Sequence, residues 1–536
     1  MRISIGGWDL AVIVAYLVGI VGLGCWAGWR QRRLPAGEGK DYFLAGGTLT
    51  WVVIGAALFS TNISTIHLVS LAQEGYVNGL AYGNFEWMAA FTLIALSLFF
   101  APFYIRSRVA TLPDFLEKRY NRACRDWLAV LSIVSAIFIH IGFSLYTGAV
   151  VLRGLFGINI YTSIIVTSVL TGLYTIVGGL LAVVLTESIQ TVILLAGAIC
   201  ITVIAYTEVG GWSALRAVVE PVKLTVLRSA EESPTLPWYA VFLGYPVIGL
   251  WYWCADQTIV QRVLGARDEN HARVGPLFAG FIKILPVFIF VLPGLLCYAL
   301  IRQGKLPNTL TDSADTYAFM IGHLLPVGLK GLVAAALLAA LMSTVSGALN
   351  SIATLFCYDL YKRFKPDVPD HRLVMIGRWV TFAAMVAAIV WSPFVSHFES
   401  IFQGIVAVIC YIAPPITAVF VWGVFWRRAS GRAAQLTLYI GTAIGFVVFL
   451  LDWFKKQTGW NVPSMMATFY LFALCSMILA VISWLKPHEH TEESRRLVWS
   501  HPLESLRFPG WPGLGNYKLL AAALFAVMVA LYIIFR

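Results

Sequence analysis

Charged residues are scarce in this chain: Asp, Glu, Lys and Arg together account for 12% of its 536 residues. A soluble globular protein has about 25% charged and roughly 45–50% apolar residues, whereas 59% of this chain is hydrophobic. Low-complexity segments are also missing, and no stretch is polar enough to form a separate soluble domain. These shortages exclude a soluble enzyme and a disordered polypeptide, and they indicate a membrane protein.

Cysteine pairs and catalytic motifs are absent as well. The sequence has 8 cysteines but no Cys-x-x-Cys pair, and most of them lie inside apolar runs, where cysteine behaves as a small hydrophobic residue. There is no His-Glu-x-x-His motif, no Gly-x-Ser-x-Gly motif and no phosphate-binding loop of an ATPase. We therefore expect neither a disulfide scaffold, nor an enzyme, nor an ATP-driven pump.

Long apolar runs make up most of the chain. A helix needs about 20 apolar residues to cross the ~30 Å hydrocarbon core of a bilayer, and the sequence contains about fourteen such runs. They lie at 8–29, 50–73, 79–105, 126–152, 158–178, 182–206, 238–262, 275–301, 326–361, 374–394, 400–425, 433–453, 464–485 and 517–535. The sequence thus predicts an all-α, multi-pass membrane protein with about 14 transmembrane helices.

Basic residues gather in alternate loops of this predicted topology. Those loops are 30–40, 106–125, 262–273, 362–372, 427–432 and 486–507. Cytoplasmic loops are enriched in Lys and Arg, so the net charge of +11 indicates topology and not nucleic-acid binding. Both termini are then outside, as is the long connection 207–237. The polar stretch 487–500 is predicted to be a solvated cytoplasmic linker, with a metal site at His488 and His490 as the alternative.

Two runs of small polar residues interrupt the apolar segments. The first is LFSTNIST at 58–65, and the second is AALMSTVSG at 339–347. Hydroxyls in membrane helices often bond back to the helix or permit close packing. A broken helix would instead free carbonyls and hydroxyls to coordinate a hard cation. Both interpretations remain open on these residues alone.

Ionisable residues inside apolar runs are functional candidates because a charge in a membrane is costly. They are His67, Glu86, Glu187, Asp256 and Lys283. Glu86 and Lys283 could instead extend to the two interfaces, and His67 could be a neutral histidine bonded within the bundle. For Asp256, an ion pair with Arg262 at the inner face is favoured over a ligand role.

Aromatic residues cluster in the middle of the seventh run, at Trp251, Tyr252 and Trp253, with Phe85 and Trp87 elsewhere. Aromatic faces stack on the C–H faces of sugars, while polar groups bind the hydroxyls. Packing within the bundle or an interfacial belt is the alternative.

The sequence resembles the sodium:solute symporter family, in its sodium/glucose cotransporter branch, from about residue 8 to the C-terminus. The matching motifs are DYFLAGG (41–47), STNI (60–63), FEW (85–87), GGL (178–180), TESIQ (186–190), WYWCADQ (251–257), VQR (260–262), SGALNS (346–351) and YDLY (358–361). The resemblance implies a LeuT-type core of two inverted five-helix repeats. Each repeat begins with a broken helix, here expected at 58–65 and near 246–254.

This resemblance divides the chain into five parts. They are a peripheral helix and basic loop (1–49), the first repeat (50–206), the outer connection (207–237), the second repeat (238–425) and three peripheral helices with a cytoplasmic linker (426–536). It also implies a sodium site and a sugar site. The sodium ligands fall on Ser60, Ile63, Ala340, Ser343 and Thr344, and the substrate-binding residues fall on Asn62, His67, Glu86, Tyr252, Trp253 and Lys283.

Three positions depart from the family pattern. Val406 stands where relatives have a sugar-contacting Gln, and Gly249 stands where they have Asn or Thr, so the usual hexose is not assured. Glu187 replaces an Asp thought to serve a second sodium ion in relatives. We expect a carboxylate solvated at the inner vestibule and one sodium per substrate. An altered second site and an ion pair with a loop arginine are the alternatives.

The sequence therefore predicts sodium-coupled symport of a sugar or polyol by alternating access. The expected partners are sodium, the solute and the lipid bilayer, with no nucleic acid, in a protein functional as a monomer. The expected location is the plasma membrane, which is the inner membrane in a bacterium. A sugar sensor with the same fold, and a sodium symporter for a non-sugar solute, are the alternatives.

Overall fold

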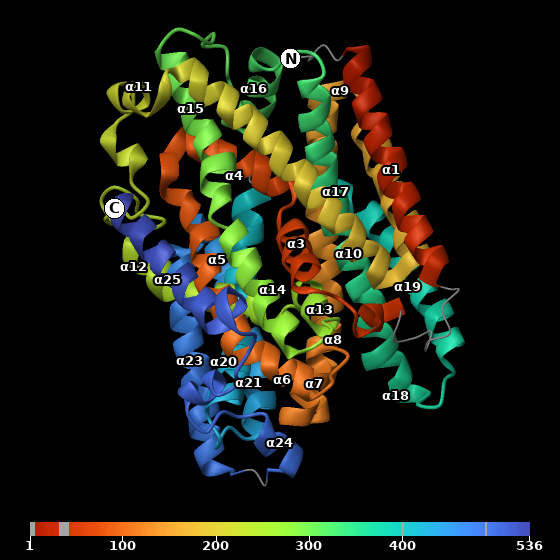
Figure 1. The fold of residues 1–536 in the computed structure, drawn as a ribbon. Coiled ribbons are helices and arrows are strands. Elements are labelled where there is room, and N and C mark those ends of the chain that lie inside the picture. Colours follow the sequence, from red (N-terminus) through yellow and green to blue (C-terminus); the bar gives the residue numbers. More distant parts are fainter. Residues whose placement is uncertain (1–5, 32–41, 398–400, 488–489) are drawn as a thin grey trace.

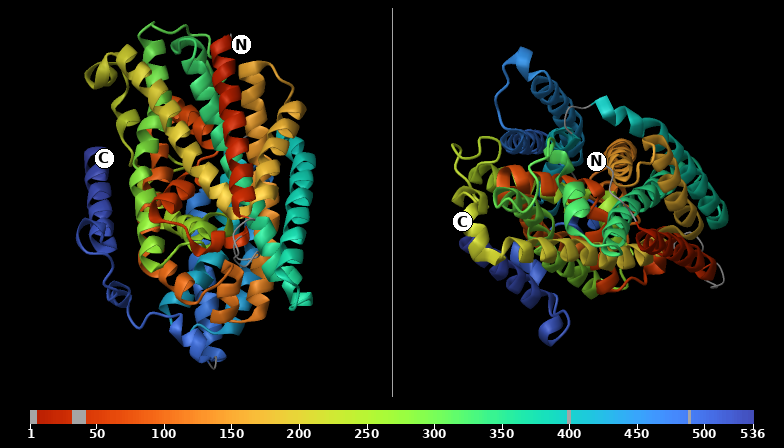
Figure 2. Two further views of the ribbon diagram at one scale, coloured as in Figure 1. Left: turned by 45° about the vertical axis from the view of Figure 1, so that its right-hand side comes forward. Right: turned by 90° about the horizontal axis from the view of Figure 1, so that it is seen from above.

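The computed structural model describes residues 6–31, 42–397, 401–487 and 490–536, and nearly all of them are helical. The described residues contain no β-strand, only an isolated bridge between Leu49 and Ala266. Most helices stand side by side along one axis (Figure 1; Figure 2). His488 and the segment 32–41, with part of the first basic loop, lie outside the described residues.

One set of helices forms the predicted apolar runs. They are α1 (Gly7–Gln31), α3 (Trp51–Asn62), α4 (Thr65–Asn78), α5 (Asn84–Ala95), α6 (Ala101–Arg106), α8 (Arg122–Ser135), α9 (Ser144–Phe156), α10 (Ile160–Val209), α12 (Trp238–Leu250), α13 (Gln257–Leu264), α14 (Glu269–Ile282), α15 (Leu292–Arg302), α17 (Leu329–Leu355), α19 (Asp370–Trp391), α20 (Ile401–Phe425), α21 (Gly431–Trp453), α23 (Ser464–Leu485) and α25 (Tyr517–Ile534). Short helices connect them: α7 (Leu112–Arg119), α11 (Gly211–Val218), α16 (Thr316–Leu324), α18 (Lys362–Phe364), α22 (Lys455–Thr458) and α24 (Glu492–Arg496).

Eleven helical segments in the described part of the chain are long and apolar enough to cross a membrane. This is three fewer than the fourteen predicted crossings, because the criterion of length and apolarity misses two of them and joins two others into one segment. The pair α3/α4 is broken, α12 continues into the aromatic π-helical turn Trp251–Ala255, and α10 holds two crossings. At 50 residues, α10 would be about 75 Å long if straight. The fourteen predicted runs are thus all helical.

Glycine bends α10 at the expected boundary between two crossings. Gly179 has φ 58° and ψ −154°, a conformation open mainly to glycine. A Cβ there would lie 2.4 Å from the Tyr42 carbonyl oxygen, so the segment after α1 packs directly on this bend.

Two helices at the centre are broken. Between α3 and α4, Ile63 and Ser64 have extended backbones, which confirms the break expected at 58–65. The second break lies at Asp256, between the π-helical turn and α13. It therefore falls after the predicted stretch near 246–254, because the aromatic segment winds into a π-helix before it ends. At each break a side chain caps the next helix: Ser64 and His67 cap α4, and Asp256 accepts from Thr258 N at 2.7 Å.

The helix α17 is the most deeply buried candidate span of the described chain, and it packs on both α10 and α1. Asp9 of α1 is fully buried and accepts hydrogen bonds from Gly328 N (2.6 Å) and Gly331 N (2.8 Å) at the start of α17. A carboxylate suits the positive end of a helix dipole. The first helix is therefore attached to the central helix of the fold.

The two ends of the molecule differ in charge. Helices α7, α18 and α24, which carry basic residues of the loops assigned to the cytoplasm, lie at the end opposite the N-terminus (Figure 1). The stretch 490–500 is partly helical and packed, with Ser494, Val498 and Trp499 buried. The prediction of a solvated linker is therefore wrong for that part.

Substitution of Gly179 by Ala should lower the thermal unfolding temperature, with a cost of about 1–3 kcal/mol, since it adds both a strained φ and a clash. Gly157→Ala is the matched control: Gly157 has φ 68°, but a Cβ there would meet nothing within 4 Å. It should show the strain alone, about 1 kcal/mol. Equal unfolding temperatures for the two variants would show that Tyr42 does not constrain the bend.

Candidate functional site

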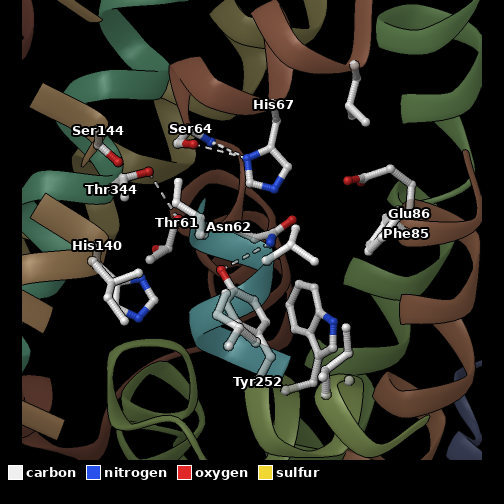
Figure 3. Close-up of a pocket in the computed structure, with 18 of the residues that line it drawn as sticks. Thr61, Asn62, Ser64, His67, Phe85, Glu86, His140, Ser144, Tyr252 and Thr344 are labelled. Carbon is white, nitrogen blue, oxygen red and sulfur yellow. Dashed lines mark hydrogen bonds between the residues drawn. The ribbon is translucent and has the colours of Figure 1, made fainter. Parts of the chain in front are cut away.

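One cavity lies at the level of both helix breaks. Its volume is about 1060 Å³ with its open mouth included. It is lined by Thr61, Asn62, Ser64, His67, Leu71, Phe85, Glu86, Ile139, His140, Ser144, Tyr245, Ile248, Gly249, Tyr252, Trp253, Lys283, Thr344, Ile405, Val406 and Ile409. All six residues predicted to bind substrate are in this set, although they come from five separate helical segments (Figure 3).

Glu86 and Lys283 form a buried ion pair in the cavity wall. The Lys283 Nζ donates to Glu86 Oε2, and the side chains are 2% and 1% exposed. The ammonium also lies 5.5 Å from the centre of the Trp253 ring. Extension of these side chains to the membrane interfaces, the alternative raised from sequence, is therefore wrong. Two charges in a membrane protein are tolerated where each compensates the other.

Asn62 and His67 are set by the break between α3 and α4. The Asn62 Nδ2 donates to the Tyr252 hydroxyl at 3.0 Å, whereas its buried Oδ1 has no partner in the described structure. The Nδ1 of His67 accepts from Ser64 N at 3.2 Å, which leaves the other side of the ring turned to the cavity (Figure 3). A buried acceptor without a partner is expensive, so the Asn62 carbonyl is free for a ligand hydroxyl.

Hydroxyl groups of α17 face backbone oxygens of the α3/α4 break. The Ser343 hydroxyl lies 2.9 Å from the Ser60 carbonyl oxygen and 3.1 Å from that of Ala340. The Thr344 hydroxyl lies 3.2 Å from the carbonyl oxygens of both Thr61 and Ala340. These carbonyl and hydroxyl groups offer only oxygen atoms as ligands, which suits a hard cation such as sodium. The structure thus brings together four of the five predicted sodium residues.

The fifth, Ile63, lies at the break itself, with its N–H bonded to Phe59 O at 3.0 Å. The carbonyl of Thr61 belongs to the same oxygen cluster but was not predicted from sequence. A backbone carbonyl leaves no signature in the side-chain pattern, so only the structure shows which carbonyls face α17.

Glu187 is fully buried and forms an ion pair, so the expected solvated carboxylate is wrong. Its oxygens accept from Arg262 at 2.6 and 3.3 Å and from the Thr61 hydroxyl at 2.8 Å. The ion-pair alternative holds, with Arg262 of α13 as the partner. Gly347 of α17 leaves room for the guanidinium, because a Cβ there would lie 2.4 Å from an Arg262 nitrogen.

Asp256 pairs with His140 and not with Arg262, so that sequence-based expectation is also wrong. The His140 Nε2 lies 3.3 Å from Asp256 Oδ2. His140 and Ser144 both line the cavity on the wall opposite Glu86 (Figure 3). Sequence reasoning missed both, although a histidine within an apolar run was a usable signal.

Two of the three departures from the family pattern, Val406 and Gly249, also line the cavity. At Gly249 a Cβ would lie 2.7 Å from the Tyr245 ring and 2.9 Å from Thr92 Cγ2. A larger polar residue at Gly249 would require these neighbours to move. The part of the cavity formed by these two residues is therefore apolar.

Substitutions of Glu187 and of Arg262 should have strongly non-additive effects on the free energy of unfolding. Removal of one partner leaves an unpaired buried charge, which costs about 3–5 kcal/mol. We expect Glu187→Gln and Arg262→Gln each to lower the unfolding temperature markedly, and the double variant to recover part of the loss. Arg106→Gln, which removes an exposed pair with Glu269, is the control and should have little effect. Simple additivity of the two buried substitutions would contradict a direct pair.

The sequence matches a known protein family and several curated proteins. The family model described as "Sodium:solute symporter family" matches residues 42–441. Among curated relatives, the chain is 33% identical to sodium/glucose cotransporter 4 of Mus musculus, over 92% of this chain and 77% of that protein. It is 32% identical to sodium/myo-inositol cotransporter 2 of Sus scrofa (92% and 78%) and 33% identical to the sodium/mannose cotransporter of Bos taurus (92% and 89%).

Solved structures show the same fold. A Na⁺-coupled sialic acid symporter, in a substrate-bound outward-open state, aligns with a TM-score of 0.78 at 21% identity, over 91% of this chain and 100% of that one. Mhp1, a nucleobase-cation-symport-1 family transporter, aligns with a TM-score of 0.57 at 14% identity, over 86% and 98%. The chain thus shares its overall fold with these two transporters. By its sequence over most of its length, the chain belongs to the sodium:solute symporter family.

Proposed function

We propose that this protein is a sodium-driven symporter of a sugar or polyol that works by alternating access. The observation that carries this proposal is that the oxygen cluster and the cavity share residues. Thr61 and Thr344 line the cavity, and the carbonyl of one and the hydroxyl of the other meet in the oxygen cluster. Ion and solute would therefore bind side by side, so each can alter the affinity for the other.

Sodium would be held by the Ser60 and Ala340 carbonyls and the Ser343 and Thr344 hydroxyls, with Ile63 at the break. Thr61 adds a further carbonyl. The ligands come from α3 and α17, which otherwise meet through weak hydroxyl–carbonyl contacts. A bound cation would join these two segments and favour one conformation, which is the requirement for a ligand to shift an equilibrium.

Polar side chains would form hydrogen bonds with the hydroxyls of the solute, and aromatic rings beside them would pack against its C–H groups. Glu86 accepts, Lys283 donates, and the Asn62 Oδ1 and the free side of His67 complete the polar wall. The rings of Tyr252 and Trp253 offer faces that pack on C–H groups. Because Val406 and Gly249 make their own part of the wall apolar, the preferred solute has fewer hydroxyls on that side than the hexoses that the family's Gln would bind.

The relatives named as glucose, myo-inositol and mannose cotransporters support a polyhydroxyl solute. Glu86 on its own would repel a carboxylate-bearing solute. Lys283 reduces this repulsion, since it compensates the Glu86 charge. A sensor that binds sugar without transport is disfavoured because it has no need of a sodium site.

The membrane arrangement belongs to the same proposal. The N- and C-termini lie outside, the two repeats span 50–206 and 238–425, and the monomer is the transport unit in a plasma membrane or bacterial inner membrane. The C-terminal end packs on the connection 207–237, where Val226 N donates to Phe535 O at 2.8 Å. The basic helices lie at the other end of the bundle (Figure 1), as cytoplasmic loops should.

The driving force can be bounded for the one sodium per substrate that we propose. One charge crossing ~100 mV gains about 2.3 kcal/mol, and a tenfold sodium gradient adds about 1.4 kcal/mol. The sum of ~3.7 kcal/mol supports roughly 500-fold accumulation of the solute.

Ser343→Ala combined with Thr344→Ala should abolish sodium-driven uptake in proteoliposomes while the protein still folds, because two oxygen ligands are lost and no replacement is near. Ser351→Ala is the control, because Ser351 is a buried residue of the same helix, α17, and is not one of the proposed sodium ligands. Uptake with unchanged sodium dependence in the double variant would refute the sodium assignment.

Glu86→Ala should weaken solute binding by at least ~100-fold, which is ~2.7 kcal/mol, because loss of the carboxylate leaves Lys283 and a solute hydroxyl unpaired. Binding is measured as the solute-induced rise in unfolding temperature, in a screen of sugars and polyols with sodium present. The rise caused by sodium alone serves as the control and should persist. If the solute response survives as well, Glu86 is outside the binding site.

A further inference from the structure

A second cavity lies at the basic end of the molecule, away from the solute site. Its walls are Arg427, His490, Arg495 and Val498, and its volume is about 690 Å³ with its open mouth included. Arg427 belongs to the turn between α20 and α21, whereas the other three flank or form α24. Two segments far apart in sequence thus bring two arginines and a histidine to one hollow.

The side chain of Arg119, in α7, forms hydrogen bonds with both of these segments. Its fully buried guanidinium donates to the carbonyl oxygens of Gly423 (2.7 Å), Trp426 (3.1 Å) and Ala429 (3.3 Å) around that turn. It also donates to the Ser494 hydroxyl at 3.3 Å, and the Ser494 hydroxyl donates back to the Arg119 carbonyl at 2.8 Å. The relative position of the turn and α24 is therefore fixed by a network of hydrogen bonds.

Positive charge at this hollow is not neutralised by the described part of the chain. The carbonyl and hydroxyl groups that accept from Arg119 are neutral, and burial lowers the pKa of its guanidinium from the ordinary value. The exposed Arg427 and Arg495 form no ion pair with any described carboxylate. The nearby acids are engaged elsewhere, because Glu493 pairs with Lys118 at 3.3 Å and Glu492 with Arg496 at 3.7 Å.

We propose that this hollow is a binding site for a phosphate-bearing anion, with Arg427 and Arg495 as its direct ligands and His490 and Arg119 behind them. Guanidinium groups bind phosphate oxygens through paired charge-assisted hydrogen bonds. Basic pockets on the cytoplasmic side of membrane proteins bind lipid head groups. The phosphate can come from an anionic lipid of the inner leaflet or from a soluble phosphate compound, and both sources share this chemistry.

The test uses the purified full-length chain and two probes at constant ionic strength. One probe is inorganic phosphate in detergent, and the other is phosphatidylglycerol added to phosphatidylcholine nanodiscs. The readout is the unfolding temperature as a function of probe concentration. Saturation with inorganic phosphate assigns a soluble source, whereas saturation with phosphatidylglycerol alone assigns a lipid head group; either outcome supports the site.

Two double variants separate a built site from general attraction. Arg427→Gln with Arg495→Gln should weaken the apparent affinity by about 30-fold, the effect of two arginine contacts near a membrane surface. Arg428→Gln with Arg432→Gln removes the same charge from two exposed arginines close to Arg427 in sequence that do not line the hollow, and it should change the affinity far less. No saturable response to either probe, or an equal loss in both double variants, would overturn the proposal.

Discussion

The structure depends on a break in the helix pair α3/α4 that is packed against an unbroken, deeply buried α17. A backbone interrupted inside a membrane exposes carbonyl groups that lipid cannot satisfy. Here the carbonyls of Ser60 and Thr61 are met by the hydroxyls of Ser343 and Thr344. A hydroxyl that donates to a carbonyl can rotate about its C–O bond. Its oxygen would then face a bound cation, and the cation would replace the hydrogen bond. The contacts that stabilise the break therefore gather these oxygens at the place where we propose that sodium binds.

Other charges near the centre are paired so that each stabilises a particular contact between helices. Glu187 with Arg262 joins α10 to α13, and Asp256 with His140 joins the second break to the π-helical segment Ala136–Phe143 between α8 and α9. Glu86 with Lys283 is the pair that a solute can reach, since both residues line the cavity. Buried pairs of this kind add little net stability but penalise any arrangement that separates them. Movement during transport must therefore keep them paired or replace a partner with solute, ion or water.

Much of the fold and of the cavity could be predicted from sequence, because both leave side-chain signals. Apolar length fixes where helices cross, and the polar run at 58–65 marked the first break. The positions of Asn62, His67 and Glu86 around one cavity followed from the family motifs. Pairings between distant segments could not be predicted in this way. Arg262 is close to Asp256 in sequence yet bonds to Glu187, because α13 turns its side chain toward α10 and Gly347 leaves space for it. The Thr61 carbonyl was missed for a related reason: a backbone oxygen has no sequence pattern.

We propose that one sodium ion and one solute molecule cross the membrane together. The most direct measurement is the reversal potential of the solute-dependent current in proteoliposomes that hold the purified protein, with defined sodium and solute gradients across the membrane. The account predicts a reversal potential that shifts with both gradients in the ratio of one sodium per solute, about 59 mV for each tenfold change in either gradient, since one charge moves per cycle. A reversal potential that ignores the sodium gradient, or a solute that binds without any current or uptake, would contradict it.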